Sequence, residues 1–177
     1  ALEPEDMGEL LNEYFSCMND IIQKYGGTLA NITGDALFVF FGAPDRTDDR
    51  DHALRCVRMA MEMQQKMQAL QKKWFSEGIE YPLQIRCGIS TGMATVGSFG
   101  SGQRSEYSAM GMQVNLASRL ETACEPGGIL ISHSTWALTN DQIDCRSKET
   151  IVVKGFSRPL RAYEVKLGTN NGRKSAI

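Results

Sequence analysis

The chain has 177 residues and a formal net charge of −2, with 42% hydrophobic and 23% charged residues. This length suits one domain with a substantial core. A net charge so close to zero excludes binding of nucleic acid through overall charge. No apolar run approaches the roughly 20 residues that span a bilayer, and the acidic residues 1–6 do not resemble a signal peptide. We expect no nucleic-acid partner and no membrane contact for this domain.

Five cysteines are dispersed along the chain, and none forms a C-x-x-C pair. Zinc binding and dithiol redox chemistry therefore lack support. An odd number of cysteines spread over predicted helices and strands indicates reduced, mostly buried thiols in a cytoplasmic domain. His52 and His133 lie far apart without a patterned metal or triad partner, so we expect structural or surface roles for both.

Residues 2–24 carry apolar side chains at helical spacing, and Gly26-Gly27 ends the predicted helix. Because the chain begins almost at a helix start, we expect a fragment of a longer protein with at least one strand upstream. Residues 28–32 and 37–41 predict two strands joined by the turn 33–35. The second strand is a continuous apolar run, which is typical of a strand buried on both faces.

Asp35 lies at the tip of this hairpin, directly after Gly34, which is free to adopt a positive φ. A carboxylate there either caps the turn or holds a cation, and capping is the commoner role for an Asp after a turn glycine. Four aspartates follow within residues 45–51. Their spacing does not match a calcium loop, so we expect a solvated loop that caps the next helix.

The rest of the chain alternates between strand and helix patterns. The predicted helices are residues 49–74, 113–123 and 134–139, and the predicted strands are residues 83–91, 93–98, 105–110, 129–132, 150–153 and 160–167. Gly92 is expected to turn the strand 83–91 into its partner 93–98. This order predicts an α+β or mixed α/β domain with helices covering a sheet, followed by a disordered tail at residues 168–177.

Two features outside the hairpin suggest anion binding. Asn115 and Arg119 are four residues apart on a predicted helix, so they share one face. An amide beside a guanidinium suits ribose and phosphate oxygens, although a solvent-facing helix stripe gives the same pattern. Lys154 lies in a turn beside Gly155, where its amine could reach an anion; taken alone it is an ordinary surface lysine.

Four motifs in order resemble the catalytic domain of class III adenylyl/guanylyl cyclases, most closely the bacterial homodimeric type. They are GGTL-x4-GDA at residues 26–36, IRCGISTG at 85–92, G-x-x-VNLASRLE at 111–121 and VKGF at 153–156. The resemblance covers residues 2–167 and implies a cyclase catalytic domain at residues 1–167 that lacks its first strand. It also implies a ferredoxin-like α/β sandwich with a mostly antiparallel central sheet, which works as a head-to-tail homodimer with two sites at the interface.

The resemblance assigns roles to individual residues. Asp35 matches the second of two metal-binding aspartates, for two Mg²⁺ or Mn²⁺ ions per site. Asn115 and Arg119 match the pair that the partner subunit supplies to orient the ribose and to stabilise charge on the α-phosphate. Lys154 and Arg86 match the basic residues that hold the triphosphate. The implied reaction converts ATP to 3′,5′-cyclic AMP and pyrophosphate, in a signalling protein with an upstream regulatory domain and with or without a membrane anchor.

Two departures from the family pattern bear on activity. The first metal aspartate of the family lies on a strand upstream of Ala1, so we expect this chain by itself to be inactive. Purine choice rests on positions that match Asn31 and Ser108, whereas adenylyl cyclases typically have Lys with Asp or Thr and guanylyl cyclases Glu with Cys. The missing Glu favours ATP over GTP. The alternatives are a guanylyl cyclase and a non-catalytic module that dimerises or binds nucleotide.

Overall fold

The structure is a computed structural model that describes residues 3–80 and 83–168. From residue 169 on, the expected tail lies outside the described residues, as does Leu2 of the first predicted helix. The helices are α1 (Pro4–Tyr25), α2 (Asp49–Ser76), α3 (Met112–Ala123) and α4 (His133–Thr139), with a short 3₁₀ turn at Gly102–Arg104. The strands are β1 (Thr28–Thr33), β2 (Ala36–Phe40), β3 (Cys87–Ile89), β4 (Thr95–Phe99), β5 (Glu106–Met110), β6 (Ile129–Ser132), β7 (Cys145–Ser147) and β8 (Ala162–Val165).

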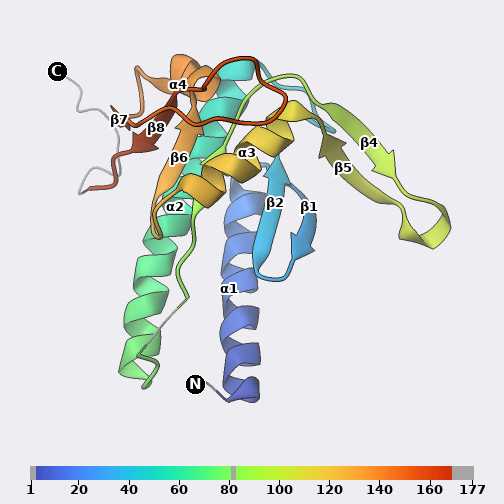
Figure 1. Ribbon diagram of the computed structural model, residues 1–177. Coiled ribbons are helices and arrows are strands. Elements are labelled where there is room, and N and C mark those ends of the chain that lie inside the picture. The colour runs from blue at the N-terminus through green and yellow to red at the C-terminus, as the bar shows by residue number, and fades with distance from the viewer. Residues whose placement is uncertain (1–2, 81–82, 169–177) are drawn as a thin grey trace.

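A four-stranded sheet with the order β3-β6-β8-β7 lies between two helical layers (Figure 1). β3 and β6 are parallel, and the other two pairs are antiparallel. Ile129 and Ile131 pack with side chains of α2, whereas Leu130 between them packs with side chains of α3. This alternation lets one strand fill both cores. The expected α+β sandwich of helices around a mostly antiparallel sheet is confirmed, with strand pairs β1–β2 and β4–β5 as separate ladders.

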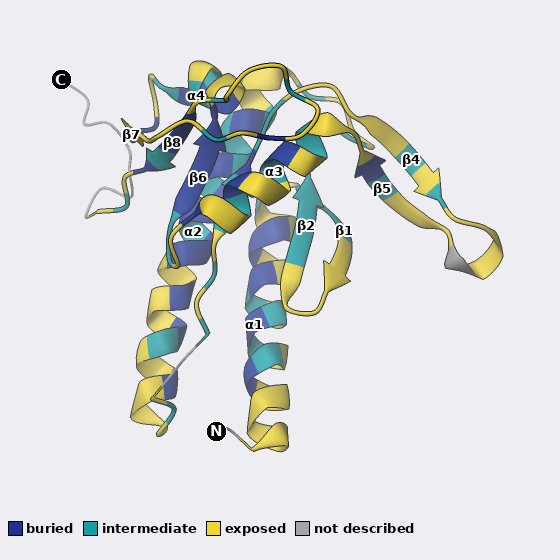
Figure 2. Ribbon diagram, viewed as in Figure 1, coloured by how far each residue is buried: buried dark blue, intermediate teal, exposed yellow. Residues whose placement is uncertain are grey.

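A third core is formed by α1, α2 and the β1–β2 hairpin (Figure 1). Met18 and Ile22 of α1 and Met67 of α2 are fully buried there. The β4–β5 hairpin instead extends away from the body and is mostly exposed (Figure 2). Within residues 3–80 and 83–168, no helix has both the length and the apolar character needed to cross a membrane.

The prediction that β2 is buried on both faces is wrong. Leu37 and Val39 pack against the α1–α2 core, but β2 is only half-buried throughout its apolar part. Phe38 and Phe40 alternate to the other face, where the Phe40 ring lies 5.7 Å from the ring of Tyr107 in β5. Among the described residues no helix covers that face, so its aromatic side chains stay partly exposed.

The predicted strand 83–91 is reduced to Cys87–Ile89, and it does not pair with the segment after Gly92. Two glutamines of α2 bind the segment before β3, because Gln71 donates to the Leu83 carbonyl at 3.0 Å and Gln64 to the Ile85 carbonyl at 3.0 Å. The Leu83 carbonyl is thereby satisfied without a neighbouring strand, whereas the Ile85 carbonyl also accepts a 2.8 Å hydrogen bond from the backbone N–H of Gly127, just before β6. β3 pairs with β6, and the expected partner strand 93–98 shifts to β4, which pairs with β5.

The predicted strand 150–153 is also wrong. Only Ile151 pairs, in an isolated bridge to Leu160. The edge strand that pairs with β8, on the side away from β6, is β7. Its sequence Cys145-Arg146-Ser147 is too short and polar to show a strand pattern. The other elements match the predictions to within a few residues at each end.

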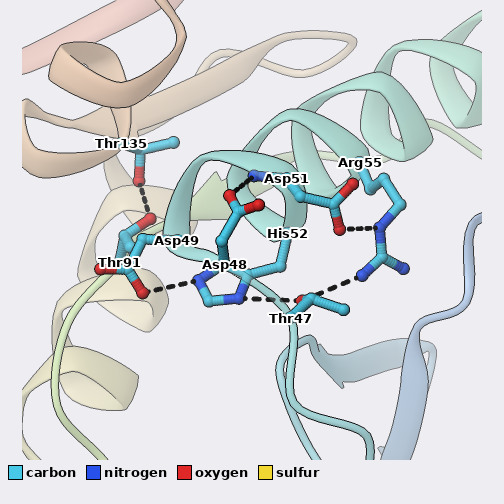
Figure 3. Close-up of polar contacts among 8 residues, drawn as sticks. All are labelled: Thr47, Asp48, Asp49, Asp51, His52, Arg55, Thr91 and Thr135. Atoms are coloured by element: carbon cyan, nitrogen blue, oxygen red, sulfur yellow. Dashed lines mark hydrogen bonds and ion pairs between the residues drawn. The ribbon is translucent and has the colours of Figure 1, made fainter.

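The start of α2 is fixed by a polar network (Figure 3). The Asp48 side chain accepts a hydrogen bond from the Asp51 backbone N–H at 2.8 Å, which confirms that this acidic loop caps the helix. His52 lies between Thr47 Oγ1, 3.3 Å from its Nδ1, and Asp49 Oδ1, 3.6 Å from its Nε2. Arg55 donates to the Tyr25 carbonyl at 2.6 Å, so the network also ties α2 to the end of α1. His52 therefore has the expected structural role.

Candidate active site

Helix α3 presents the predicted donor patch to solvent. Leu116 and Leu120 are buried against the sheet, and this apolar pair fixes which way the helix faces. Asn115 and Arg119 are exposed one turn apart. Within the described part of the chain, neither side chain makes a hydrogen bond or an ion pair. Their donors are therefore available to a ligand.

Residues 150–160, here called the strap, run across α3 (Figure 1). Ile151 and Leu160 close the base of the strap through two backbone hydrogen bonds of 2.8 and 2.7 Å. Val153 is only 3% exposed and packs in one cluster with buried leucines of α3. Lys154 follows it and is exposed. The turn then passes through Gly155, at φ +95°, beside the start of α3. Packing of the strap thus brings Lys154 onto the helix that carries the donor patch.

Arg86 lies just before β3, at the other end of α3. Its Nε is 3.5 Å from Glu121 Oε1, and its Nη1 donates to the Thr122 carbonyl at 3.4 Å. Both partners are at the surface, where such a pair adds little stability. Gly88 lets β3 approach α3 closely, since a Cβ at this residue would lie 2.3 Å from the Ala117 carbonyl oxygen. Arg86 therefore reaches α3 from a strand held tightly against it.

Asp35 lies in the Asp35 turn, defined as residues 33–36, and every residue of this turn is exposed. Its carboxylate has no hydrogen bond or ion pair among the described residues, so it does not cap the turn. Its backbone carbonyl accepts a hydrogen bond of 3.1 Å from the hydroxyl of Tyr14 in α1. The free carboxylate removes the capping alternative and leaves its oxygens available to a ligand.

Asn31 and Ser108 lie on β1 and β5. A bulge between Leu29 and Asn31 changes the register, so that Leu29 faces Val39 and Asn31 faces Phe38. Without the extra residue Asn31 would share the core face of Leu29, two residues earlier. The bulge turns Asn31 to the outer face with Phe38. Ser108 is half-buried and pairs with Gly97 across the β4–β5 ladder.

The structure thus gathers four predicted residues around α3 and leaves three on hairpins. Asn115 and Arg119 are on α3, Lys154 is on the strap and Arg86 reaches the C-terminal end of the helix. A hollow of about 360 Å³ at that end is lined by ten residues, and none of the seven predicted residues is among them. A site made by this chain alone would be open, which fits one completed by a second copy.

Two buried residues that position parts of the candidate site were not predicted from the sequence. Tyr14 lies on the apolar stripe of α1, and Gln64 is 3% exposed in α2. A glutamine within an otherwise apolar stripe was the available signal for Gln64. Tyr14 gave no such signal, because a tyrosine on an apolar stripe is most often ordinary core.

The residues present fit a divalent cation that protein and substrate hold together. In the described ranges, no three or more His, Cys, Asp or Glu side chains are grouped to hold a metal. Mg²⁺ is usually bound by one or two carboxylates plus substrate phosphates. The exposed, unpaired carboxylate of Asp35 is a suitable single oxygen ligand for such a site.

Residues 1–167 match the family described as the adenylate and guanylate cyclase catalytic domain. The adenylyl cyclase CyaB from P. aeruginosa is 46% identical, with a TM-score of 0.91 over 96% of this chain and 87% of that one. The guanylyl cyclase Cya2 is 36% identical, with a TM-score of 0.85 over 93% and 82%. Adenylate cyclase 1 of Rhizobium meliloti (strain 1021) is 34% identical over 92% of this chain, which spans 24% of that relative.

These matches identify the class as nucleotidyl cyclase domains. The chain belongs to the adenylate and guanylate cyclase catalytic domain family.

Proposed function

We propose that this domain converts ATP to 3′,5′-cyclic AMP and pyrophosphate at two sites shared between the subunits of a homodimer. The observation that carries the proposal is the exposed pair Asn115 and Arg119, which has no partner among the described residues and lies on the helix against which the strap that bears Lys154 packs. A helix serving only as a folding element has no need of this arrangement. Family membership supplies the reaction class.

In the proposed reaction the ribose 3′-oxygen attacks the α-phosphorus while the bond to pyrophosphate breaks. Asn115 orients the ribose, and Arg119 donates to the charge that develops on the α-phosphate. Lys154 and Arg86 hold the triphosphate. Asp35 would hold Mg²⁺ or Mn²⁺. Binding of two ions per site would need one further aspartate from outside this chain. Such ions would activate the 3′-hydroxyl and neutralise phosphate charge.

Exposed apolar side chains on the extended β4–β5 hairpin support the homodimer. Met110 is 55% exposed, Val96 and Tyr107 are also exposed on this hairpin, and Met112 is exposed at the start of α3. Apolar side chains gathered on a projecting element are typical of protein–protein contacts. A structure of the guanylyl cyclase domain of the RhoGC fusion protein, described as a non-canonical dimer, shares the fold at 24% identity and a TM-score of 0.78. A second copy would bring Asp35 of one chain to α3 of the other.

The choice of ATP rests on two observations. Asn31 and Ser108 lack the carboxylate that a guanine N1–H and N2–H₂ would need. The 46% identical neighbour is an adenylyl cyclase, and the 36% identical one is a guanylyl cyclase. One related guanylate cyclase domain was solved in complex with GTP. The catalytic core of a rhodopsin-guanylyl cyclase with converted specificity was solved in complex with ATPαS. Since relatives of both specificities share this fold, guanylyl cyclase activity is the alternative.

A non-catalytic module is the second candidate, because Asn31 and Ser108 match neither typical purine pair.

The chain spans about a quarter of the length of its relative from Rhizobium meliloti. We accordingly propose a signalling role under an upstream regulatory domain in a parent protein. The five cysteines are dispersed along the chain without a C-x-x-C pair, which favours a cytoplasmic location for the domain.

The test is a cyclase assay on the parent protein with Mn²⁺ or Mg²⁺, using ATP and GTP separately. We expect cyclic AMP from ATP and a much lower rate with GTP. Preferred turnover of GTP would select the alternative activity. No product from either nucleotide, while both still bind, would select the non-catalytic module.

A further inference from the structure

One buried side chain holds the Asp35 turn in place. The turn is exposed throughout, and the Asp35 carboxylate has no partner among the described residues. In that same part of the chain, the 3.1 Å bond from Tyr14 Oη to the Asp35 carbonyl is the only side-chain hydrogen bond to residues 33–36. The position of the carboxylate therefore depends on a backbone that this one bond connects to α1.

Tyr14 is well suited to act as a fixed donor. The residue is 3% exposed, and its ring packs at 5.0 Å from the ring of Phe15. Burial, with a smaller effect from Cys87 and Asp35, raises the pKa of Tyr14 to about 12. The hydroxyl thus keeps its proton at neutral pH. A buried tyrosine hydroxyl needs a hydrogen-bond partner, and here the partner is a carbonyl of the turn.

We propose that Tyr14 is a positioning residue for the divalent-metal site, which acts by fixing the backbone from which the Asp35 carboxylate projects. The inference rests on the proposed function, which makes Asp35 a metal ligand. Groups behind a ligand that fix its orientation commonly change metal affinity by about 10- to 100-fold when they are lost. Tyr14 would do so through the main chain of the ligand, without touching the metal.

The test compares Tyr14→Phe with Tyr25→Phe, which removes a hydroxyl from the same helix. Tyr25 Oη lies 3.4 Å from Glu62 Oε1, away from the Asp35 turn. Amide hydrogen exchange of residues 33–36 is measured by mass spectrometry on the 177-residue chain. Mn²⁺ binding by the parent protein is measured by electron paramagnetic resonance with 3′-deoxy-ATP, which cannot cyclise. Thermal unfolding of each variant is recorded alongside.

We expect Tyr14→Phe to speed exchange in the turn and to weaken Mn²⁺ binding by about 10-fold, with Tyr25→Phe unchanged in both. If Tyr14→Phe lowers only the melting temperature and leaves turn exchange and Mn²⁺ affinity as in the unaltered protein, Tyr14 is ordinary core and the inference is overturned. If the unaltered parent protein binds no Mn²⁺, the proposed role of Asp35 fails. In that case, amide hydrogen exchange of residues 33–36 in the 177-residue chain is the remaining measurement that shows whether Tyr14 orders the turn.

Discussion

Arg119 is exposed on α3 and has no hydrogen-bond or ion-pair partner in the described ranges, so folding does not depend on its guanidinium. Arg119→Ala in the parent protein should lower kcat by about 10²-fold or more, as does the loss of a donor to transition-state charge. The melting temperature should stay the same. The matched control is Arg146→Ala on β7, another exposed arginine. Equal rates for the two variants would remove Arg119 from the reaction.

Buried thiols give a pH prediction at the same scale. Burial raises the pKa of Cys87 to about 12 and that of Cys124 to about 11, from an ordinary value of 9.0. Both therefore stay neutral at pH 8, and alkylation by iodoacetamide should be slower than in the urea-unfolded chain by about 10²-fold for Cys124 and about 10³-fold for Cys87. Mass spectrometry of the labelled peptides measures the alkylation rates in the folded and the unfolded chain. Similar rates in both states would contradict the prediction.

The same shifts affect stability. Because the folded-state pKa values are raised, the neutral thiols contribute fully to the free energy of unfolding below about pH 9. This contribution is lost as the pH rises toward 11 and 12. The free energy of unfolding in urea should therefore fall between pH 9 and pH 11. A Cys87→Ala, Cys124→Ala chain serves as the control and should show a smaller fall over that interval.

At the scale of the elements, contact between β3 and α3 depends on Gly88. A Cβ there would lie 2.3 Å from the Ala117 carbonyl oxygen and 2.3 Å from the Glu121 backbone nitrogen. Gly88→Ala must push the helix away and should cost about 3 kcal/mol or more of stability, at the upper end of overpacking. Gly97→Ala on β4 is the control, since nothing lies within 4 Å of its Cβ position. Urea unfolding that is equal for both variants would contradict this close packing.

Gln64 links α2 to the segments before β3 and β6. Its Nε2 donates to the Ile85 carbonyl at 3.0 Å and to the Gly128 carbonyl at 2.9 Å. Gln64→Leu should lower the free energy of unfolding by about 1–3 kcal/mol, because two side-chain hydrogen bonds are lost although each carbonyl keeps a backbone donor. Gln65→Leu, on the exposed face of the same helix, should change it little. A neutral Gln64→Leu would show that these bonds add no net stability.

The helices were predictable, but which strands form and how they pair was less so. Helices α1 and α2 follow from long apolar stripes that local sequence reveals. The shortness of β3 could not be read from residues 83–91, because the carbonyls of Leu83 and Ile85 accept hydrogen bonds from Gln71 and Gln64, which lie in another element. β7 was missed because three residues carry no usable periodicity. Contacts with distant segments, which strand propensity does not reveal, contribute to these differences.

At the scale of the whole molecule, the candidate site was predictable only as separate motifs. Asn115 and Arg119 share a helix face by spacing alone, and the structure bears out their exposure. That Val153 packs with α3 and brings the Lys154 turn to the helix depends on tertiary packing. The bulge that turns Asn31 outward depends on pairing with β2. The roles proposed for these residues are completed only when a second copy is present.

The most direct measurement mixes two inactive parent proteins, one carrying Asp35→Ala and the other Arg119→Ala. If each site takes Asp35 from one subunit and Arg119 from the other, a mixed dimer contains one intact site. Free exchange makes about half of the dimers mixed, so about a quarter of the original activity should return. A site shared between subunits predicts this recovery of activity in the mixture and no activity for either variant alone. A mixture that exchanges subunits, as shown by a tagged pull-down, and still makes no cyclic nucleotide would contradict the shared site.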